Sequence, residues 1–277
     1  MTVGDALREA ARRLEAVTDT ARLDAEVLMA EALGKSRSAM LLRHMGDPPP
    51  DLFEALVARR LRHEPIAQIL GRKEFYGREF RVCPDVLTPR ADSEATVAAA
   101  LEVCPPNARI LDCGTGSGAL LLTLLAELPG ASGVGIDRSA AALAVATDNA
   151  ARLGLVRRAE MRLADWDDPR WREGLGRFDR IVANPPYVET TVELPSSVRD
   201  YEPAGALYAG PEGLDAYRVL IPQLSALLTP GGAAVLEIGA TQAEAVASIA
   251  SGAGFRSELR RDLGGLPRAL ILRLGLV

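Results

Sequence analysis

From Asp92 onward the sequence alternates short apolar runs with stretches of helical spacing, and this alternation limits the available folds more than any other feature. Alternating strands and helices form a mostly parallel sheet that is covered by helices on both faces. The last two apolar runs have only a short connection, which predicts an antiparallel hairpin at one edge. We therefore predict an α/β domain with seven strands, at residues 109–112, 133–137, 160–163, 180–183, 233–237, 255–258 and 269–274.

The first part of the chain has a helical period instead. Its apolar residues recur at spacings of three and four, and Thr20 and Gly34 stand where a helix would be capped and ended. This pattern predicts a small helical bundle with its own core, with further helices at 36–44 and 50–62. The expected apolar faces comprise Ala6, Ala10 and Leu14 in the first helix and Leu23, Val27, Leu28, Ala30 and Leu33 in the second.

Between residues 66 and 82 the apolar period changes to two, around Gly71 and Gly77. Strand-like spacing interrupted by glycines predicts a β-hairpin, which here would link two domains. We expect an N-terminal helical domain at 1–64, a hairpin linker at 65–90 and a larger α/β domain at 91–277.

Composition excludes several classes of protein. The 32 basic residues are outnumbered by 37 acidic ones, which gives a formal net charge of −5, so a general nucleic-acid coat is not expected. The chain has three cysteines, Cys83, Cys104 and Cys113, none of them in a C-x-x-C pair. Its only histidines are His44 and His63, so we expect no metal site. No apolar run approaches the roughly 18 residues of a membrane span. We expect a cytoplasmic protein without metal, membrane or direct nucleic-acid binding.

Residues 110–118 read Ile-Leu-Asp-Cys-Gly-Thr-Gly-Ser-Gly, an apolar strand end followed by a glycine-rich turn. Glycines allow a backbone to adopt positive φ and to approach a ligand closely. A dinucleotide-binding turn would need its third glycine at position 119, which is Ala. An acid, Asp112, followed by G-x-G-x-G resembles the nucleoside-binding loop of S-adenosylmethionine methyltransferases. The alternative is a tight strand-to-helix turn of any α/β protein.

Two further positions support a nucleoside site. Asp137 ends the next strand, about twenty residues after the loop, where a carboxylate can accept hydrogen bonds from both ribose hydroxyls. Asp165 and Trp166 follow the third strand, where such folds usually hold the adenine. An indole can stack on the base, and a carboxylate can accept from its exocyclic amine. Plain packing remains the alternative for Trp166.

The segment Asn184-Pro185-Pro186-Tyr187 follows the fourth strand, at the sheet edge where ligands bind in this architecture. The Asn184 side-chain oxygen and the Pro185 carbonyl can each accept one N–H of a planar NH₂ group. The prolines hold the loop rigid, and Tyr187 offers a flat face. This predicts methyl transfer to adenine, cytosine or glutamine. A rigid turn or a proline-rich ligand motif is the alternative.

Beyond these motifs, the chain resembles the release factor glutamine methyltransferase family over nearly its whole length. The similar segments lie on both sides of the glycine-rich loop and are specific to that family. They are Pro65-Ile66-Ala67, residues 71–77 and 88–94, Tyr201-Glu202-Pro203, Ala206-Leu207, Gly210, Gly213-Leu214, Tyr217-Arg218 and Leu236-Glu237-Ile238-Gly239.

This resemblance implies a Rossmann-like S-adenosylmethionine methyltransferase domain and an N-terminal domain that helps dock the release factor. It also implies methylation of N5 of the glutamine in the Gly-Gly-Gln motif of class 1 release factors, proteins of translation termination. The family often has an aromatic residue at Gln68, proline at Ala91 and an aromatic residue at Asp167. The cofactor contacts that it implies are Gly114, Thr115, Gly116, Ser117, Gly118, Asp137, Trp166 and Asn184, to which the residue pattern above adds Asp165, and the glutamine contacts are Asn184, Pro185, Pro186 and Tyr187.

The sequence leaves two alternatives to glutamine methylation. An N6-adenine methyltransferase of nucleic acid would use the same Asn-Pro-Pro-Tyr segment, but it would have to hold a polyanion, and this acidic chain shows no basic groove. A catalytically idle cofactor-binding module is hard to reconcile with an intact Asn184 loop. A cofactor-binding titration beside a turnover assay would separate the two.

Overall fold

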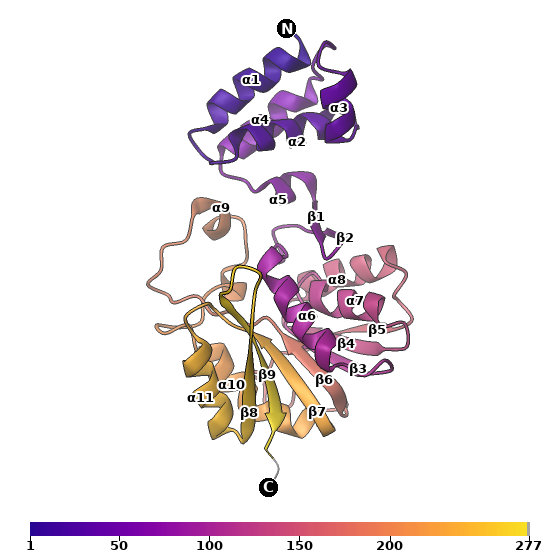
Figure 1. The fold of residues 1–277 in the computed structure, drawn as a ribbon, viewed down its shortest axis with the longest axis vertical. Coiled ribbons are helices and arrows are strands. Elements are labelled where there is room, and N and C mark those ends of the chain that lie inside the picture. The colour runs from indigo at the N-terminus through magenta and orange to yellow at the C-terminus, as the bar shows by residue number, and fades with distance from the viewer. Residues whose placement is uncertain (276–277) are drawn as a thin grey trace. The chain divides into compact units, whose positions relative to one another are not determined.

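The computed structural model describes residues 1–275, which divide into two compact units (Figure 1). The first unit contains residues 1–72 together with the distant segment 194–201. The second contains residues 73–193 and the chain from 202 onward. Each unit has its own buried apolar core.

The first unit is helical, as expected. Its first helix begins with a capping box, in which Thr2 accepts from the Asp5 backbone and the Asp5 side chain accepts from Thr2. Leu7, Met29 and Met40 are fully buried in its core. Its helices are α1 (Val3–Leu14), α2 (Ala21–Leu33), α3 (Arg37–Arg43), α4 (Leu52–Leu61), α5 (Ile66–Leu70) and α9 (Ser196–Arg199).

Helix α2 differs from the expectation at its start and on its inner face. Thr20 stands at the N-cap position as expected, but its hydroxyl makes no capping bond to the helix backbone and donates to the Asp24 side chain. Gly34 does end it, in the left-handed conformation at φ 61°. The expected apolar face was wrong at Leu23, which is exposed, whereas Asp24 and Glu26 are buried. Apolar spacing alone cannot reveal a face that buries charges with arginine partners.

The expected hairpin between 66 and 82 was correct only in its second half. Residues 66–70 form α5, because the Pro65 carbonyl accepts from the backbone of Gln68 and Ile69 and so closes the first helical turn. The hairpin itself consists of β1 (Arg72–Phe75) and β2 (Arg78–Arg81). Tyr76 and Gly77 form its turn, both at positive φ.

Gln68, one of the departures from the family pattern, has a structural role in the first unit. Its side chain is buried, and its Nε2 donates to the Tyr201 carbonyl over 3.1 Å. The Tyr201 hydroxyl donates to the carbonyl of Arg62 over 2.7 Å. These two bonds hold the end of segment 194–201 against the helices of the first unit.

The second unit is built on one seven-stranded sheet with the order β5-β4-β3-β6-β7-β9-β8. Strands β3 to β7 pair in parallel, whereas β9 pairs antiparallel with both β7 and β8. The expected terminal hairpin is therefore confirmed, with β9 inserted between β7 and β8. The strands are β3 (Arg109–Cys113), β4 (Ser132–Asp137), β5 (Ala159–Leu163), β6 (Phe178–Ala183), β7 (Leu228–Glu237), β8 (Phe255–Arg261) and β9 (Pro267–Leu274).

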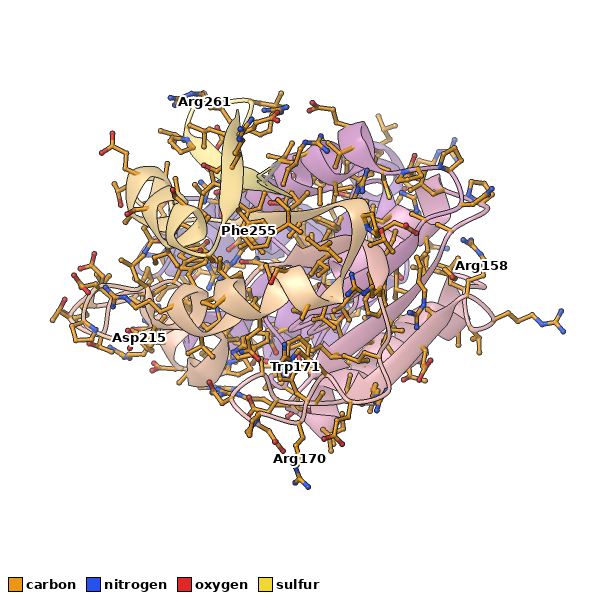
Figure 2. All side chains as sticks on the ribbon, turned by 90° about the horizontal axis from the view of Figure 1, so that it is seen from below. Arg158, Arg170, Trp171, Asp215, Phe255 and Arg261 are labelled. Atoms are coloured by element: carbon orange, nitrogen blue, oxygen red, sulfur yellow. The ribbon has the colours of Figure 1, made fainter. Side chains whose placement is uncertain are left out.

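Helices cover both faces of this sheet (Figure 1). Alternate strand residues point to opposite sides, so that Ile110 packs with α6 and α7 while Leu111 packs with α10 and α11. Trp171 is buried on the second side, where its Nε1 donates to Gln223 of α10 (Figure 2). The helices are α6 (Glu94–Val103), α7 (Ala119–Glu127), α8 (Ala140–Arg152), α10 (Asp215–Leu224) and α11 (Ala243–Gly252), with 3₁₀ turns η1 (Ala91–Ser93), η2 (Ala204–Ala206) and η3 (Ser225–Leu227).

This topology fixes where a ligand can bind. The strand order reverses at β3, which pairs with β4 on one side and with β6 on the other. Ligands of doubly wound folds bind at the carboxyl ends of strands at such a reversal. Within residues 1–275, no helix is long and apolar enough to span a membrane. The same residues contain no group of three His, Cys, Asp or Glu side chains placed to hold a metal ion.

Candidate active site

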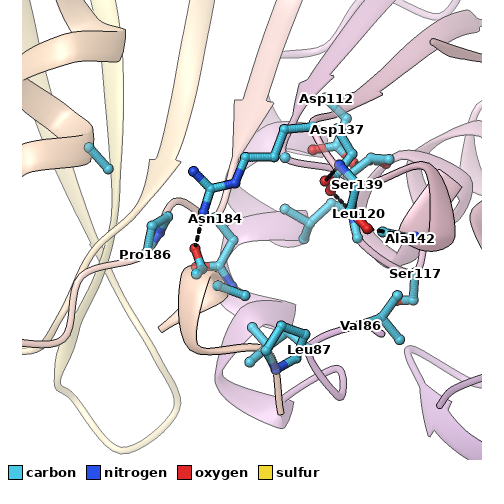
Figure 3. Close-up of a pocket in the computed structure, with 18 of the residues that line it drawn as sticks. Val86, Leu87, Asp112, Ser117, Leu120, Asp137, Ser139, Ala142, Asn184 and Pro186 are labelled. Carbon is cyan, nitrogen blue, oxygen red and sulfur yellow. Dashed lines mark hydrogen bonds between the residues drawn. The ribbon is translucent and has the colours of Figure 1, made fainter. Parts of the chain in front are cut away.

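A pocket of about 560 Å³ opens in the second unit and takes its walls from the loops after β3, β4, β5 and β6 (Figure 3). Its volume is that of a typical small-molecule site. Asn184 and Pro186 lie on the opposite side of it from Ser117 and Ala142, with Val86 and Leu87 between them. The expected site residues that line it are Gly114, Thr115, Gly116, Ser117, Asp137, Asp165, Trp166, Asn184 and Pro186, together with Asp112.

Three expected residues are not part of the pocket lining. Gly118 begins α7 at φ 82°, and a Cβ there would lie 2.8 Å from Leu122 Cδ1, so this glycine allows the loop to pack on its own helix. Pro185 is buried. Tyr187 packs against the core, and its carbonyl accepts from Gln242 Nε2 over 3.1 Å. Gly118 and Tyr187 therefore support the two loops whose neighbouring residues line the pocket.

The glycine-rich loop has the backbone that its sequence predicts. Gly114 and Gly116 have φ of 75° and 54°, in the left-handed region. A Cβ at Gly114 would lie 3.1 Å from the Trp166 ring, whereas one at Gly116 would meet no atom within 4 Å. The absence of a side chain at Gly114 therefore lets the Trp166 ring pack on the loop. The absence of one at Gly116 leaves open space beside the loop.

Asp112 has an unusual environment for a carboxylate. It is 1% exposed, and its Oδ2 accepts from the Thr115 hydroxyl over 2.7 Å. Its Oδ1 has no hydrogen-bond partner. Burial raises the pKa of Asp112 to about 7, although the Thr115 hydrogen bond lowers it. A buried acceptor without a partner beside a pocket is suited to a cationic or N–H-bearing ligand group.

Asp137 is joined to the glycine-rich loop. Its Oδ2 accepts from the Gly116 backbone over 3.0 Å, and its Oδ1 accepts from the Ser139 backbone over 2.9 Å. A carboxylate oxygen can accept more than one hydrogen bond, so both oxygens retain capacity for ligand hydroxyls.

Asp165, Trp166 and Asp167 form another wall of the pocket. The Trp166 carbonyl accepts from Gln223 Nε2 over 3.1 Å, which ties this loop to α10. Asp165 Oδ1 accepts from the Asp167 backbone over 3.1 Å. At Asp167, where the family often has an aromatic residue, this chain places a carboxylate at the pocket instead.

Asn184 follows β6 directly, and its Nδ2 donates to the Ser93 hydroxyl over 3.4 Å. Because the amide nitrogen is used in this way, the side-chain oxygen remains available as an acceptor. Ser93 also lines the pocket, although sequence reasoning gave it no role.

Two pocket walls were missed from the sequence. One comes from the segment before α6, including Val86, Leu87 and Arg90, and the other runs from Pro203 to Val219. Arg90 pairs with the buried Glu202 over 2.7 Å, which joins these two walls. Segment 88–94 and several separate positions between 201 and 218 resemble the family in the sequence, and that similarity was the signal that could have placed these walls at the site.

The fold and the pocket define an S-adenosylmethionine-dependent methyltransferase. A profile described as "Methyltransferase domain" matches residues 105–256, and one described as "PrmC N-terminal domain" matches residues 5–71. The chain belongs to the release factor glutamine methyltransferase family. It is 44% identical over 282 residues to the release factor glutamine methyltransferase of Cereibacter sphaeroides, covering 99% of each chain. It is 43% identical over 281 residues to that of Moorella thermoacetica, covering 98% of each.

Solved structures agree on the fold alone. A methyltransferase from Pyrococcus furiosus superposes with a TM-score of 0.54 at 17% identity, over 79% of this chain and 98% of that one. The residues of the pocket also fit S-adenosylmethionine as a cofactor. Asp112 provides a buried acceptor for a cationic group, and the space above Gly116 would be filled by any larger side chain.

Proposed function

We propose that this protein transfers a methyl group from S-adenosylmethionine to N5 of the glutamine side chain in the Gly-Gly-Gln motif of class 1 release factors. The observation that carries the proposal is the position of Asn184. It follows β6 at the cofactor pocket, with its amide nitrogen bound to Ser93 and its oxygen left to accept from a substrate. The names of the relatives supply the substrate class.

The cofactor is held by residues on three loops in this proposal. Asp137 accepts from the ribose hydroxyls, and Trp166 stacks on the adenine with Asp165 accepting from its amine. Asp112, whose Oδ1 is a buried acceptor, would stabilise a positively charged part of the cofactor. The segment Gly114 to Gly118 gives the ligand close access to the backbone.

The glutamine amide is a poor nucleophile, because its nitrogen lone pair is delocalised into the carbonyl group. Bound S-adenosylmethionine supplies an electrophilic methyl on its sulfonium. The Asn184 oxygen and the Pro185 carbonyl each accept one N–H of the amide and thereby aim the remaining lone pair. The nitrogen would take up this methyl group as its bond to the sulfonium sulfur breaks, and an acceptor of the chain or water would take the N–H proton that leaves. Pro186 and Tyr187 keep the loop rigid.

The helical domain, residues 1–64, is proposed to help dock the release factor. Residues 65–90 are proposed to link it to the catalytic domain, residues 91–277, with 65–72 packed in the helical unit and 73–90 in the second unit. Because the proposed substrate is a protein of translation termination, we expect the activity in the cytoplasm. Neither a metal ion nor direct contact with nucleic acid is required by this chemistry.

The test uses labelled S-adenosylmethionine with a release factor carrying Gly-Gly-Gln and with one carrying Gly-Gly-Glu, followed by peptide mass spectrometry. We expect one methyl group on the glutamine and none on the glutamate, since a carboxylate has no N–H to donate to Asn184 or Pro185. A DNA duplex serves as the competing substrate. Labelling of DNA together with none of the release factor would favour the adenine alternative. Cofactor binding with no turnover on either substrate would favour the idle module.

A further inference from the structure

Two glutamine side chains behind the pocket each hold one of its loops in the same way. Gln242 immediately precedes α11 and Gln223 lies in the last turn of α10, and these two helices pack side by side on one face of the sheet (Figure 1). Neither side chain lines the pocket. Each amide accepts from one N–H and donates to two backbone carbonyls, so both of its N–H groups are used inside the protein.

Gln242 holds the loop 184–187, which follows β6. It is 9% exposed, and its Oε1 accepts from the Gly239 backbone over 3.1 Å. Its Nε2 donates to the carbonyls of Tyr187 and Gly213, each over 3.1 Å. Because the two prolines of this loop have no N–H, the loop must be attached to its neighbours mainly through carbonyls. The Tyr187 carbonyl provides that attachment.

Two glycines leave room for the Gln242 amide. A Cβ at Gly239 would lie 2.7 Å from Gln242 Oε1, and a Cβ at Gly213 would lie 2.7 Å from Gln242 Nε2. Both separations are well below van der Waals contact, so the backbone closely encloses the amide on two sides. Its partners also determine which end is the nitrogen, since carbonyls only accept and a backbone N–H only donates. The Gln242 amide is therefore fixed in place and in orientation.

Gln223 holds the loop that contains Trp166 in the same manner. Its Oε1 accepts from Nε1 of the buried Trp171 over 2.6 Å (Figure 2). Its Nε2 donates to the Trp166 carbonyl over 3.1 Å and to the Val219 carbonyl over 2.9 Å. In the proposed function Trp166 stacks on the adenine, whereas the loop 184–187 orients the glutamine of the substrate. The two amides therefore attach two loops that have different roles.

We propose that Gln242 and Gln223 are positioning residues with separate effects, in which Gln242 sets the geometry of methyl transfer and Gln223 sets the affinity for the cofactor. The inference rests on the function proposed above. Misplacement of a reacting group by about 1 Å can cost on the order of a hundredfold in rate. Displacement of a wall that contacts only the adenine lowers the affinity instead, because the chemical step starts from the complex already bound.

The test compares Gln242→Met and Gln223→Met, which replace each amide by an unbranched side chain without an N–H. With cofactor saturating, Gln242→Met should lose about 10- to 100-fold in single-turnover methylation of a release factor and keep its affinity for S-adenosylhomocysteine within about 3-fold. Gln223→Met should show the reverse, with an affinity about 10-fold weaker and a saturated rate within about 3-fold of the wild type. Each variant is the control for the other, because both lose one amide with three hydrogen bonds.

This split between rate and affinity is what general damage to the fold would not produce. Equal losses of rate and affinity in both variants would overturn the proposal. A wild-type rate in Gln242→Met, or a wild-type affinity in Gln223→Met, would do the same. Melting temperatures identify any variant that has lost its fold.

A milder change tests Gln242 even if Gln242→Met does not fold. Gly239→Ala keeps the amide but places a methyl group 2.7 Å from its oxygen, so the amide must shift and methylation should slow by about 3- to 10-fold. Gly252→Ala is the matched control, because this glycine lies in α11 and a Cβ there would meet no atom within 4 Å. Neither glycine has positive φ. Equal rates in these two variants would overturn the role of Gln242.

Hydrogen exchange separates this inference from the proposed function, because it needs no substrate. The backbone amides of residues 187–190 should exchange faster in Gln242→Met and those of residues 165–171 faster in Gln223→Met. If this pattern is seen and no release factor is methylated, the proposed function fails while the positioning stands. If the release factor is methylated and the two variants have the same exchange pattern and the same rates, the positioning fails alone.

Discussion

The backbone N–H of Gly116 donates to Asp137 Oδ2 over 3.0 Å, so that the glycine-rich loop after β3 and the acid that ends β4 are one unit. The bond is possible because β3 and β4 are parallel neighbours whose carboxyl ends share an edge. Changing either residue should therefore disturb both the loop and the ligand contacts.

Gly116→Val should abolish cofactor binding, because a β-branched side chain disfavours positive φ and would fill the space above the loop. Gly154→Val is the matched control. Gly154 also has positive φ, at 70°, but it is exposed and does not line the pocket. The control should lose stability and retain affinity in a calorimetric titration. Wild-type affinity in Gly116→Val would refute the loop assignment.

Asp137→Ala should weaken S-adenosylmethionine by about 1 to 3 kcal/mol, the scale for removing a charged hydrogen-bond partner. Part of this loss comes from the Gly116 N–H, which loses its acceptor. Asp137→Asn keeps one acceptor oxygen and should lose less. Equilibrium titration with S-adenosylmethionine gives the affinities of the wild type, Asp137→Asn and Asp137→Ala, which should fall in that order. An unchanged affinity in the alanine variant would mean that another group holds the ribose.

Asp112 should make stability and cofactor affinity depend on pH in opposite directions. Its pKa in the folded protein, about 7, is above the ordinary value, so the stability it contributes at low pH is lost as pH rises through 7. Asp112→Asn should therefore be more stable than the wild type at pH 8, by on the order of 4 kcal/mol, with a smaller difference toward pH 4. The same variant should bind the cofactor more weakly at pH 8. Denaturant unfolding and titration at both pH values test this, and a variant less stable at pH 8 would contradict it.

Asn184→Ala should lower turnover far more than it weakens the cofactor, because its oxygen acts where the amide nitrogen acquires charge. Loss of one such acceptor typically costs on the order of a hundredfold to a thousandfold in rate, or roughly 3 to 4 kcal/mol. Asn184→Asp keeps an acceptor oxygen and should retain more activity. Equal single-turnover rates for the alanine variant and the wild type, with both substrates saturating, would rule out this role for Asn184.

In the first unit, Arg60 Nε pairs with Asp24 Oδ2 over 2.7 Å, and both side chains are nearly buried. Removing one partner of such a pair leaves a buried charge without compensation, so Arg60→Met should cost about 3 to 5 kcal/mol in stability. Arg12→Met is the exposed control, since its pair with Glu9 lies at the surface, where solvent screens it, and its removal should leave stability nearly unchanged. Chemical denaturation of both variants gives the comparison.

The sequence by itself determined the α/β class, the seven strands of the sheet and the pocket loops that follow β3, β4, β5 and β6. Short apolar strands that alternate with helices are compatible with few topologies. Gly114, Gly116 and Asn184 follow the ends of such strands, where ligands bind in this fold. The family resemblance added the substrate class. Local pattern was enough for these features because each depends on residues close together in the chain.

Only the tertiary structure decided which residues meet across long distances in the chain. Asp24 with Arg60, Arg90 with Glu202, and Ser93 with Asn184 are partners that no local period reveals. Helix α5 formed where a strand was expected, because the Pro65 carbonyl accepts from the backbone of residues that follow it. Burial raises the pKa of Glu237 to about 7, a property of the packed protein and of no segment of its sequence.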